Sequence, residues 1–421
     1  MKELKAILAM LLVILIAVGC SDPAIRSRAI AASNLMENIS SREISGKPAD
    51  DTFISSMADF SIELFKNSMT DGVNSLVSPI SVMLALAMTA NGANDETLLQ
   101  MEALLGGGIA LEELNEYLYS YVQMLPSLDK SKLSIANSIW FRDDGDTLTV
   151  NSDFLSKNAD YFGAAAYSAA FDSETVKDIN NWVYENTDGM IDKIIEEIDD
   201  FNMMFLINAV AFDAEWQSVY KANDVRKGNF TVENGAVQNV EFMHSSEYIY
   251  LDDGMATGIV KPYANGAYSF VALLPNEGIS VSEYLETLTG EGFVDTLSSK
   301  ENTLVYTSIP KFEYEYSASL KEALQALGIH DAFDGEIADF SDVATTTLGD
   351  GELFIGDVLH KTFISVDELG TRAGAVTVVS MDGAGSPANP KEVHLDRPFV
   401  YAIVDNATNL PIFIGTLMSV N

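Results

Sequence analysis

Residues 364–398 read ISVDELGTRAGAVTVVSMDGAGSPANPKEVHLDRP, and this stretch combines two different local compositions. Residues 370–379 are small and β-branched, which is typical of a strand interior. Residues 382–390 are rich in Gly, Pro, Asn and Ser, which is typical of an exposed loop. In a strand, Thr371 and every second residue after it would share one uncharged face, and Arg372 would lie on the other face. An ordinary strand followed by an ordinary surface loop has this local composition, and so does a strand that runs into an exposed, bait-like loop. The flanking sequence has to decide between these two interpretations.

Length and composition set the bounds on the fold and on the partners. The chain has 421 residues and is 48% hydrophobic, so it can bury the core of one large domain or of two medium ones. Its net charge is −38, which argues against nucleic acid and anionic membrane surfaces as partners, because binding them relies on Lys and Arg. The acidic residues are scattered, which predicts a solvated acidic surface that attracts basic partners at low salt.

The first residues resemble the export signal of bacterial lipoproteins. A basic start and an apolar stretch over 6–18 precede Cys20, the only cysteine of the chain. The resemblance implies cleavage before Cys20 and attachment of a diacylglycerol to its sulfur. We therefore expect a signal peptide over 1–19, and an exported protein that is lipid-anchored at the bacterial cell envelope, either surface-exposed or extracellular. A plain secretory signal with an incidental cysteine is the alternative interpretation.

Several further segments have readable patterns. Residues 20–52 are polar and predict a tether, with a short helix around 31–39. The apolar spacing from Phe53 onward predicts an amphipathic helix. Ser78 and Pro79 predict the start of a buried helix, with the hydroxyl of Ser78 as its cap and Gly92 at its end. The apolar run over 205–212 predicts a strand covered on both faces, and residues 405–409 predict a hairpin turn.

Taken in order, these segments resemble the serpins, a family of serine protease inhibitors. The motifs that carry the resemblance run from about residue 53 to the end of the chain and lie at 74–93, 205–216, 261–263, 309–313, 358–371 and 396–401. One departure is Asp213-Ala214, where the family usually has Lys-Gly. The resemblance implies an α+β serpin fold over 53–421, with three β-sheets, eight to nine helices and an exposed reactive-centre loop.

The resemblance also implies a function. Serpins are suicide inhibitors of serine endopeptidases, and in some cases of cysteine endopeptidases: the target cleaves the loop, and the loop inserts into the central sheet while the protease is still held as a covalent acyl complex. We expect a monomer that is not an enzyme and that needs no cofactor or metal. A non-inhibitory serpin acting as a binding or carrier module is the alternative, and the small, uncharged face of the hinge favours inhibition.

The family positions can be placed on this sequence. The hinge of the loop corresponds to Glu368, Gly370, Thr371, Ala373 and Ala375. A buried polar cluster beneath the opening of the sheet corresponds to Ser78, Ser81, Asn208 and His360. The breach at the top of the sheet corresponds to Trp216 and Lys311, and Lys311 is expected to pair with Glu368.

The scissile bond follows from counting along the loop. Counting from Gly370 places it at Ala384-Gly385, and a small residue before the cut suits elastase-like or subtilisin-like proteases. Counting back from Pro398 places it near Ser386 or Pro387. The count from Gly370 has more weight, because the sheet sets the length that inserts, whereas extra residues beyond the cut only lengthen a flexible connection. Met381 and Asp382 stay as alternatives for chymotrypsin-like and Asp-specific proteases.

No motif for another chemistry stands out. The sequence has no Walker or dinucleotide-binding loop and no His/Cys cluster at metal-ligand spacing. His360 with a Ser and an Asp could suggest a catalytic triad, but no Gly-x-Ser-x-Gly elbow accompanies it.

Overall fold

The computed structural model describes residues 30–143, 145, 148–199, 202–346, 353–371 and 389–420. Cys20 therefore lies outside the described residues, as do the hinge positions Ala373 and Ala375. The same holds for every residue considered for the scissile bond: Met381, Asp382, Ala384, Gly385, Ser386 and Pro387.

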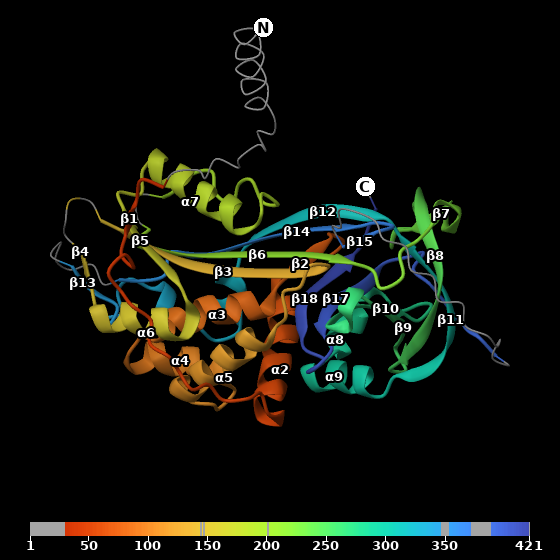
Figure 1. Ribbon diagram of the computed structural model, residues 1–421, viewed down its shortest axis with the longest axis horizontal. Coiled ribbons are helices and arrows are strands. Elements are labelled where there is room, and N and C mark those ends of the chain that lie inside the picture. Colours follow the sequence, from red (N-terminus) through yellow and green to blue (C-terminus); the bar gives the residue numbers. More distant parts are fainter. Residues whose placement is uncertain are drawn as a thin grey trace, which may run out of the picture.

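A seven-stranded sheet runs along the upper side of the molecule (Figure 1). Its strands, in order across the sheet, are β1 (Ser33–Asn34), β5 (Ala165–Ala169), β3 (Ser131–Arg142), β6 (Met204–Glu215), β15 (Gly370–Thr371), β14 (Asp357–Val366) and β12 (Phe312–Ser319). Strand β6 is buried along nearly its whole length. Phe205, Ile207 and Ala209 join a core beneath α7 (Ser173–Asn186), whereas Leu206 and Val210 join the main core on the opposite face. The prediction of a strand covered on both faces is confirmed.

A nine-stranded sheet forms the other end of the molecule. Its strands, in order, are β16 (Lys391–His394), β11 (Glu301–Pro310), β8 (Val237–Asp252), β9 (Ala256–Pro262), β10 (Tyr268–Pro275), β17 (Phe399–Asp405), β18 (Pro411–Leu417) and β2 (Ser75–Val77), with β7 (Val225–Thr231) beside β8. Strands β17 and β18 form the predicted hairpin around 405–409. A third, two-stranded sheet joins β4 (Leu148–Val150) and β13 (Ala344–Thr346).

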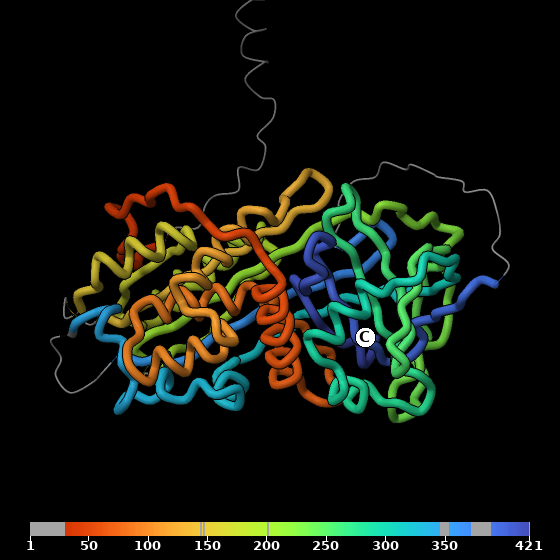
Figure 2. Tube along the Cα trace, turned by 90° about the horizontal axis from the view of Figure 1, so that it is seen from below, coloured from red at the N-terminus to blue at the C-terminus, as the bar shows by residue number. Residues whose placement is uncertain are grey.

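Within the described ranges the chain forms nine α-helices, so the predicted α+β fold with three sheets and eight to nine helices is confirmed. Besides α7 they are α2 (Asp51–Ser68), α3 (Pro79–Ala90), α4 (Asp95–Gly106), α5 (Leu111–Met124), α6 (Ser152–Phe162), α8 (Val281–Thr287), α9 (Gly290–Ser298) and α10 (Lys321–Ala326). Helix α7 lies on one face of the seven-stranded sheet and α3 to α6 lie beneath the other face (Figure 1). Figure 2 shows α2 between this helical end and the nine-stranded sheet.

Helix α3 confirms the predicted buried helix, with one correction. All of its residues are buried, and Pro79 occupies its first turn. Ser78 is the N-cap residue, but its hydroxyl makes no capping hydrogen bond. The helix ends at Ala90, with Asn91 as its C-cap, just before the predicted Gly92.

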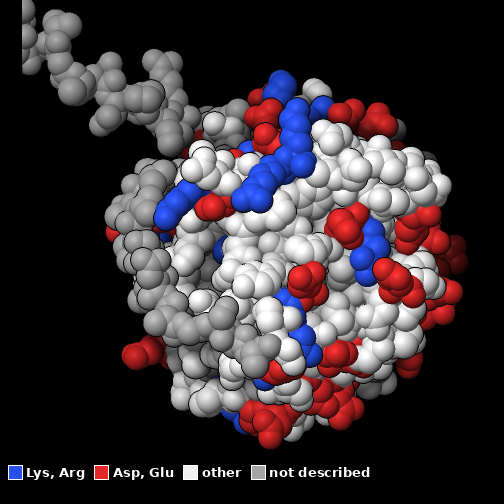
Figure 3. Space-filling view, turned by 90° about the vertical axis from the view of Figure 1, so that its right-hand side faces the viewer, with Lys and Arg blue, Asp and Glu red and all other residues white. Residues whose placement is uncertain are grey.

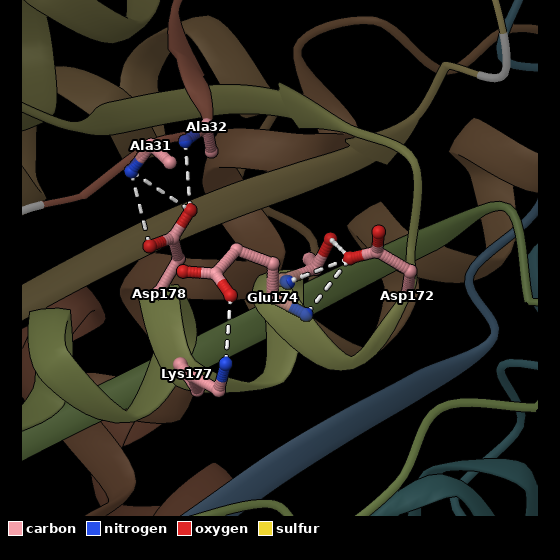
Figure 4. Close-up of polar contacts among 7 residues, drawn as sticks. Ala31, Ala32, Asp172, Glu174, Lys177 and Asp178 are labelled. Carbon is pink, nitrogen blue, oxygen red and sulfur yellow. Dashed lines mark hydrogen bonds and ion pairs between the residues drawn. The ribbon is translucent and has the colours of Figure 1, made fainter.

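The described part of the predicted tether, residues 30–52, packs on the body of the protein, and this corrects the expectation. Residues 33–34 form the edge strand β1 beside β5, and a turn follows where a helix was expected over 31–39. The backbone N–H groups of Ala31 and Ala32 donate to the carboxylate of Asp178 on α7, at 2.7–3.0 Å (Figure 4). Arg42 donates to Asp160 from both its backbone and its guanidinium. Hydrogen bonds to distant acidic residues and a few apolar contacts, among them Leu35 and Ile39 on the main core, hold this mostly polar segment in place.

We expect Asp178→Ala to release the segment around Ala31 and Ala32. Hydrogen bonds to a charged acceptor contribute about 1.5–3 kcal/mol each, so hydrogen exchange at these two amides should accelerate by at least about tenfold. Asp172→Ala is the matched control, because Asp172 also accepts two backbone N–H groups but caps α7 instead (Figure 4). Equal acceleration in both variants would contradict the assignment.

In the part of the chain that the structure describes, no helix combines the length and the apolar character that a membrane span requires. The same residues contain no group of three or more His, Cys, Asp or Glu side chains placed to hold a metal ion.

Candidate functional site

The residues Gly370 and Thr371 lie between two strands of the seven-stranded sheet. Strand β15 pairs antiparallel with β6, matching Gly370 with Glu215 and Thr371 with Ala214. On its other side Thr371 is matched with Val366 of β14. A Cβ atom at position 370 would lie 1.9 Å from the carbonyl oxygen of Ala214, so only glycine fits there. Gly370 and Thr371, the first residue of the segment expected to insert, are thus already paired within the sheet.

Further along the sheet, β6 and β14 pair directly with each other. Residues 357–361 of β14 match residues 205–209 of β6 in parallel register. A longer inserted strand would have to separate these pairs, because it would occupy the position between β6 and β14. The sheet is therefore open at the Thr371 end and closed at the other.

A tight turn joins β14 to β15. The carboxylate of Asp367 accepts the N–H of Leu369 at 2.7 Å and that of Gly370 at 3.2 Å. The segment 216–220, which follows β6, is hydrogen-bonded to this turn. The backbone N–H of Trp216 donates to the carbonyl of Leu369 at 2.8 Å, and its indole N–H donates to the carbonyl of Asp367 at 2.8 Å. We call residues 216–220 the breach segment.

Thr371 is buried at 2% exposure, and its hydroxyl hydrogen-bonds to the hydroxyl of Tyr263. Tyr263 in turn stacks on Trp216, with ring centroids 4.6 Å apart. Burial raises the pKa of Tyr263 well above its ordinary value, so the phenol stays protonated. Tyr263 was not among the predicted site residues, although the motif over 261–263 was noticed; its contact to the hinge depends on the tertiary fold.

The predicted ion pair between Lys311 and Glu368 is present, with 2.9 Å between Nζ and Oε1. Lys311 also lies 3.4 Å from Glu241. Burial opposes the charge of Glu368, but the hydrogen bond from Lys311 holds the pKa of this carboxyl below its ordinary value. Both side chains are 30% exposed, so the pair is screened by solvent.

For this pair we expect a coupling free energy of no more than about 1 kcal/mol. The measurement is a double-mutant cycle with Lys311→Met and Glu368→Gln, followed by urea unfolding and by the rate of loop insertion. The second partner, Glu241, should keep the effect of Glu368→Gln small. A coupling well above this range, or none in the insertion rate, would contradict the prediction.

The predicted sheet-opening cluster is assembled only in part. His360 and Asn208 are register partners on β14 and β6, and His360 Nδ1 lies 2.8 Å from Asn208 Oδ1. His360 Nε2 accepts the backbone N–H of Ser78 at 3.1 Å, so Nδ1 carries the proton and donates. The hydroxyls of Ser78 and Ser81 are buried and make no hydrogen bond with the described residues. Asn137, which was not predicted, accepts the amide of Asn208 at 2.7 Å.

This geometry has two consequences. No Ser hydroxyl reaches His360, so the cluster lacks the nucleophile contact of a catalytic triad. The hydrogen bond between His360 and Asn208 joins β14 to β6, the two strands that a longer inserted strand would separate. Loop insertion would break it.

Figure 3 shows the end of the molecule around β7, β8 and β11. Acidic side chains lie there in several separate groups, and a band of basic side chains crosses the upper part of the view. Acidic and basic side chains are therefore interspersed at this end.

The fold therefore has a central sheet in which the chain turns back after β14 and begins a short strand between β14 and β6. Comparison with known proteins names the class of proteins with this fold. A family model described as Serpin (serine protease inhibitor) matches residues 55–420. The chain belongs to the serpin family, a family of protease inhibitors rather than of enzymes.

Individual relatives support the assignment. The chain is 29% identical to an uncharacterized serpin-like protein of Thermococcus kodakarensis, over 87% of this chain and 85% of the relative. It is 27% identical to Serpin B3 of Homo sapiens, over 86% of this chain and 97% of that protein. The crystal structure of the thermophilic serpin tengpin in its native state is 56% identical, covering 92% of this chain and 100% of that one, with a TM-score of 0.89. The latent state of tengpin gives a TM-score of 0.79, at 52% identity and with 89% of this chain covered. The arrangement described here is thus more similar to the native state than to the latent state.

Proposed function

We propose that this serpin is a suicide inhibitor of serine endopeptidases, acting by cleavage of its loop and insertion of residues 371–384 between β6 and β14. The observation that carries the proposal is the pairing of Gly370 and Thr371 within the sheet, because insertion can then extend from a strand that has already begun. Extended over 371–384, the new strand would be roughly 46 Å long. At about 0.5–1.5 kcal/mol per new hydrogen bond, the gain is on the order of 10 kcal/mol.

The proposed scissile bond is Ala384-Gly385, with an elastase-like or subtilisin-like target. The proposal rests on the count from Gly370, which is paired with Glu215 of β6 and directly precedes the segment 371–384. The inserting face then carries Thr371, Ala373 and Ala375, which are small and uncharged. A charged or bulky face would oppose burial in the sheet.

The test is incubation of the full chain with pancreatic elastase and with subtilisin, and with trypsin as a comparison, followed by electrophoresis in SDS. An SDS-stable complex supports inhibition, and mass spectrometry of the released C-terminal fragment locates the cut. A fragment beginning at Gly385 supports the assignment, whereas one beginning at Asp382 or Gly383 contradicts it. Cleavage without any complex, with these proteases and a wider panel of serine and cysteine proteases, favours the non-inhibitory carrier role.

We further propose that the protein is a monomer, exported and anchored at a bacterial cell envelope through a lipid on Cys20. What supports this is the apolar stretch over 6–18 ending at a lipobox-like sequence. Expression in a bacterial host with labelled palmitate should label the wild type and leave Cys20→Ser unlabelled. Labelling of neither protein contradicts the anchor, and equilibrium sedimentation of the 20–421 chain tests the monomer.

A further inference from the structure

A lysine and a glutamate lie buried behind the breach segment. Lys261 is on β9 and Glu247 is on β8, and their side chains are 2% and 10% exposed. Lys261 Nζ lies 2.7 Å from Glu247 Oε1, which also accepts the hydroxyl of Ser245 at 2.6 Å. Burial opposes the charge of Lys261, but Tyr220 and Glu247 outweigh it and leave the pKa of Lys261 above its ordinary value. Well-packed apolar residues of similar volume can often replace a buried ion pair without loss of stability, so packing alone does not explain this one.

The side chain of Lys261 also contacts three residues of the breach segment. Its Nζ lies 3.4 Å from the carbonyl oxygen of Ser218. It also lies 4.4 Å from the ring centroid of Tyr220 and 5.4 Å from that of Trp216. A cation is attracted to the faces of both rings and to the carbonyl at once, which an apolar side chain of the same size cannot reproduce. The hydroxyl of Tyr220 lies 3.2 Å from that of Ser245, which adds a second link to the Glu247 side.

The same segment holds the hinge. The backbone N–H of Trp216 donates to the carbonyl of Leu369 at 2.8 Å, and that of Tyr220 donates to the carbonyl of Glu368 at 3.0 Å. The Trp216 indole adds its bond to Asp367. Two contacts in series therefore connect Lys261 to the turn that precedes β15: from Nζ to the breach segment, and from the breach segment to residues 367–369.

We propose that the buried Lys261–Glu247 pair is a positioning device, which holds the breach segment so that the hinge turn keeps β15 paired between β6 and β14. Its role in inhibition rests on the proposed function. Because insertion extends from β15, a loosened turn delays the first added pairs and gives the protease time to complete hydrolysis and leave. Loss of the pair should therefore shift the protein from inhibitor toward substrate.

The first experiment needs no target protease, so it does not depend on the proposed inhibition. Hydrogen exchange of the uncleaved full chain is followed in fragments covering 214–221 and 365–371, for the wild type and for Lys261→Met. We expect exchange at the amides of Trp216 and Tyr220 to be about tenfold faster in the variant. Asn115→Ala is the matched control, because it removes one partner of a buried polar pair, Asn91 with Asn115, in the helical end of the molecule. Unchanged exchange in Lys261→Met, or equal acceleration in Asn115→Ala, would overturn the proposal.

A double variant separates positioning from stability. Lys261→Met combined with Glu247→Met removes both charges, which should restore the urea midpoint that Lys261→Met alone loses. It does not restore the contacts to Ser218 and to the two rings, so exchange over 214–221 should stay fast. If slow exchange returns together with the midpoint, the pair is only structural and the proposal is wrong.

The second experiment measures the stoichiometry of inhibition, with whichever of elastase or subtilisin forms a complex with the wild type. We expect Lys261→Met to need several times more inhibitor per protease, with the rate of loop cleavage unchanged. If the wild type forms no complex with any protease, the proposed function fails, while the exchange experiment still decides the positioning role. If exchange accelerates but the stoichiometry stays the same, the pair positions the segment without controlling insertion, and that part of the proposal is overturned.

Discussion

Thr371→Arg is expected to convert the protein from an inhibitor into a substrate. Thr371 is 2% exposed and lies between β6 and β14, so a guanidinium at this position would be buried without an anion. Burying an unpaired charge costs several kcal/mol, which is enough to lower the yield of covalent complex by at least about tenfold. The scissile region lies further along the chain, and its cleavage should continue at the rate of the wild type.

Thr371→Val is the matched control for this variant. Valine keeps the branched shape and loses only the hydrogen bond to Tyr263, so most of the inhibition should remain. The measurement is the ratio of SDS-stable complex to cleaved inhibitor for the three proteins with the same protease. If Thr371→Arg forms complexes as well as the wild type does, insertion does not begin at β15 and the proposed mechanism is wrong.

The second large effect is a loss of stability at low pH caused by His360. Burial lowers the pKa of His360 to about 3, whereas an exposed histidine titrates near 6.5. The folded state therefore binds fewer protons than the unfolded state between these values, and stability falls as the pH falls below about 6.5. At pH 4.5 the cost should reach between about 2 and 3 kcal/mol, and it should continue to grow until the pH nears 3.

His360→Gln isolates this contribution from that of the carboxylates. Glutamine can donate to Asn208 and accept from Ser78, but it does not titrate. Urea unfolding at pH 7.5 and at pH 4.5 should show a larger loss for the wild type than for the variant. Equal losses in the two proteins would mean that His360 is not held neutral in the sheet.

The hydrogen bond between His360 and Asn208 also connects stability with insertion. It joins the two strands that a longer inserted strand would separate. Protonation of His360 would take place at Nε2, where it would break the hydrogen bond from the N–H of Ser78 and place a charge in the closed sheet. A low pH should therefore favour states in which His360 is less buried, the unfolded chain and, as we expect, the open sheet. A lower pH should accordingly accelerate insertion of a synthetic peptide with the sequence of residues 371–384 in the wild type more than in His360→Gln.

Much of the fold could be predicted because single segments carry their own physical signal. Helix α3 is apolar on every side, and such a helix is stable only when it is buried. Strand β6 is a continuous apolar run, which requires cover on both faces of the sheet. The ion pair of Lys311 with Glu368 was also predicted, but from the family resemblance, because neither residue reveals its partner on its own.

The sequence by itself determined the family, the central strand, the buried helix and the small uncharged face that begins at Thr371, since these depend on local composition and on the order of motifs. The tertiary structure decided the rest. Residues 30–50 look like a polar tether, but they pack on the body, where Asp178 and Asp160 accept their N–H groups and β1 pairs with β5. A few of their apolar side chains, among them Leu35 and Ile39, also contact the core. Lys261 and Glu247 look like surface residues, but the breach segment covers them. In each case the partner is distant in sequence or on another strand, and a polar side chain alone does not tell whether its partner will be water or protein.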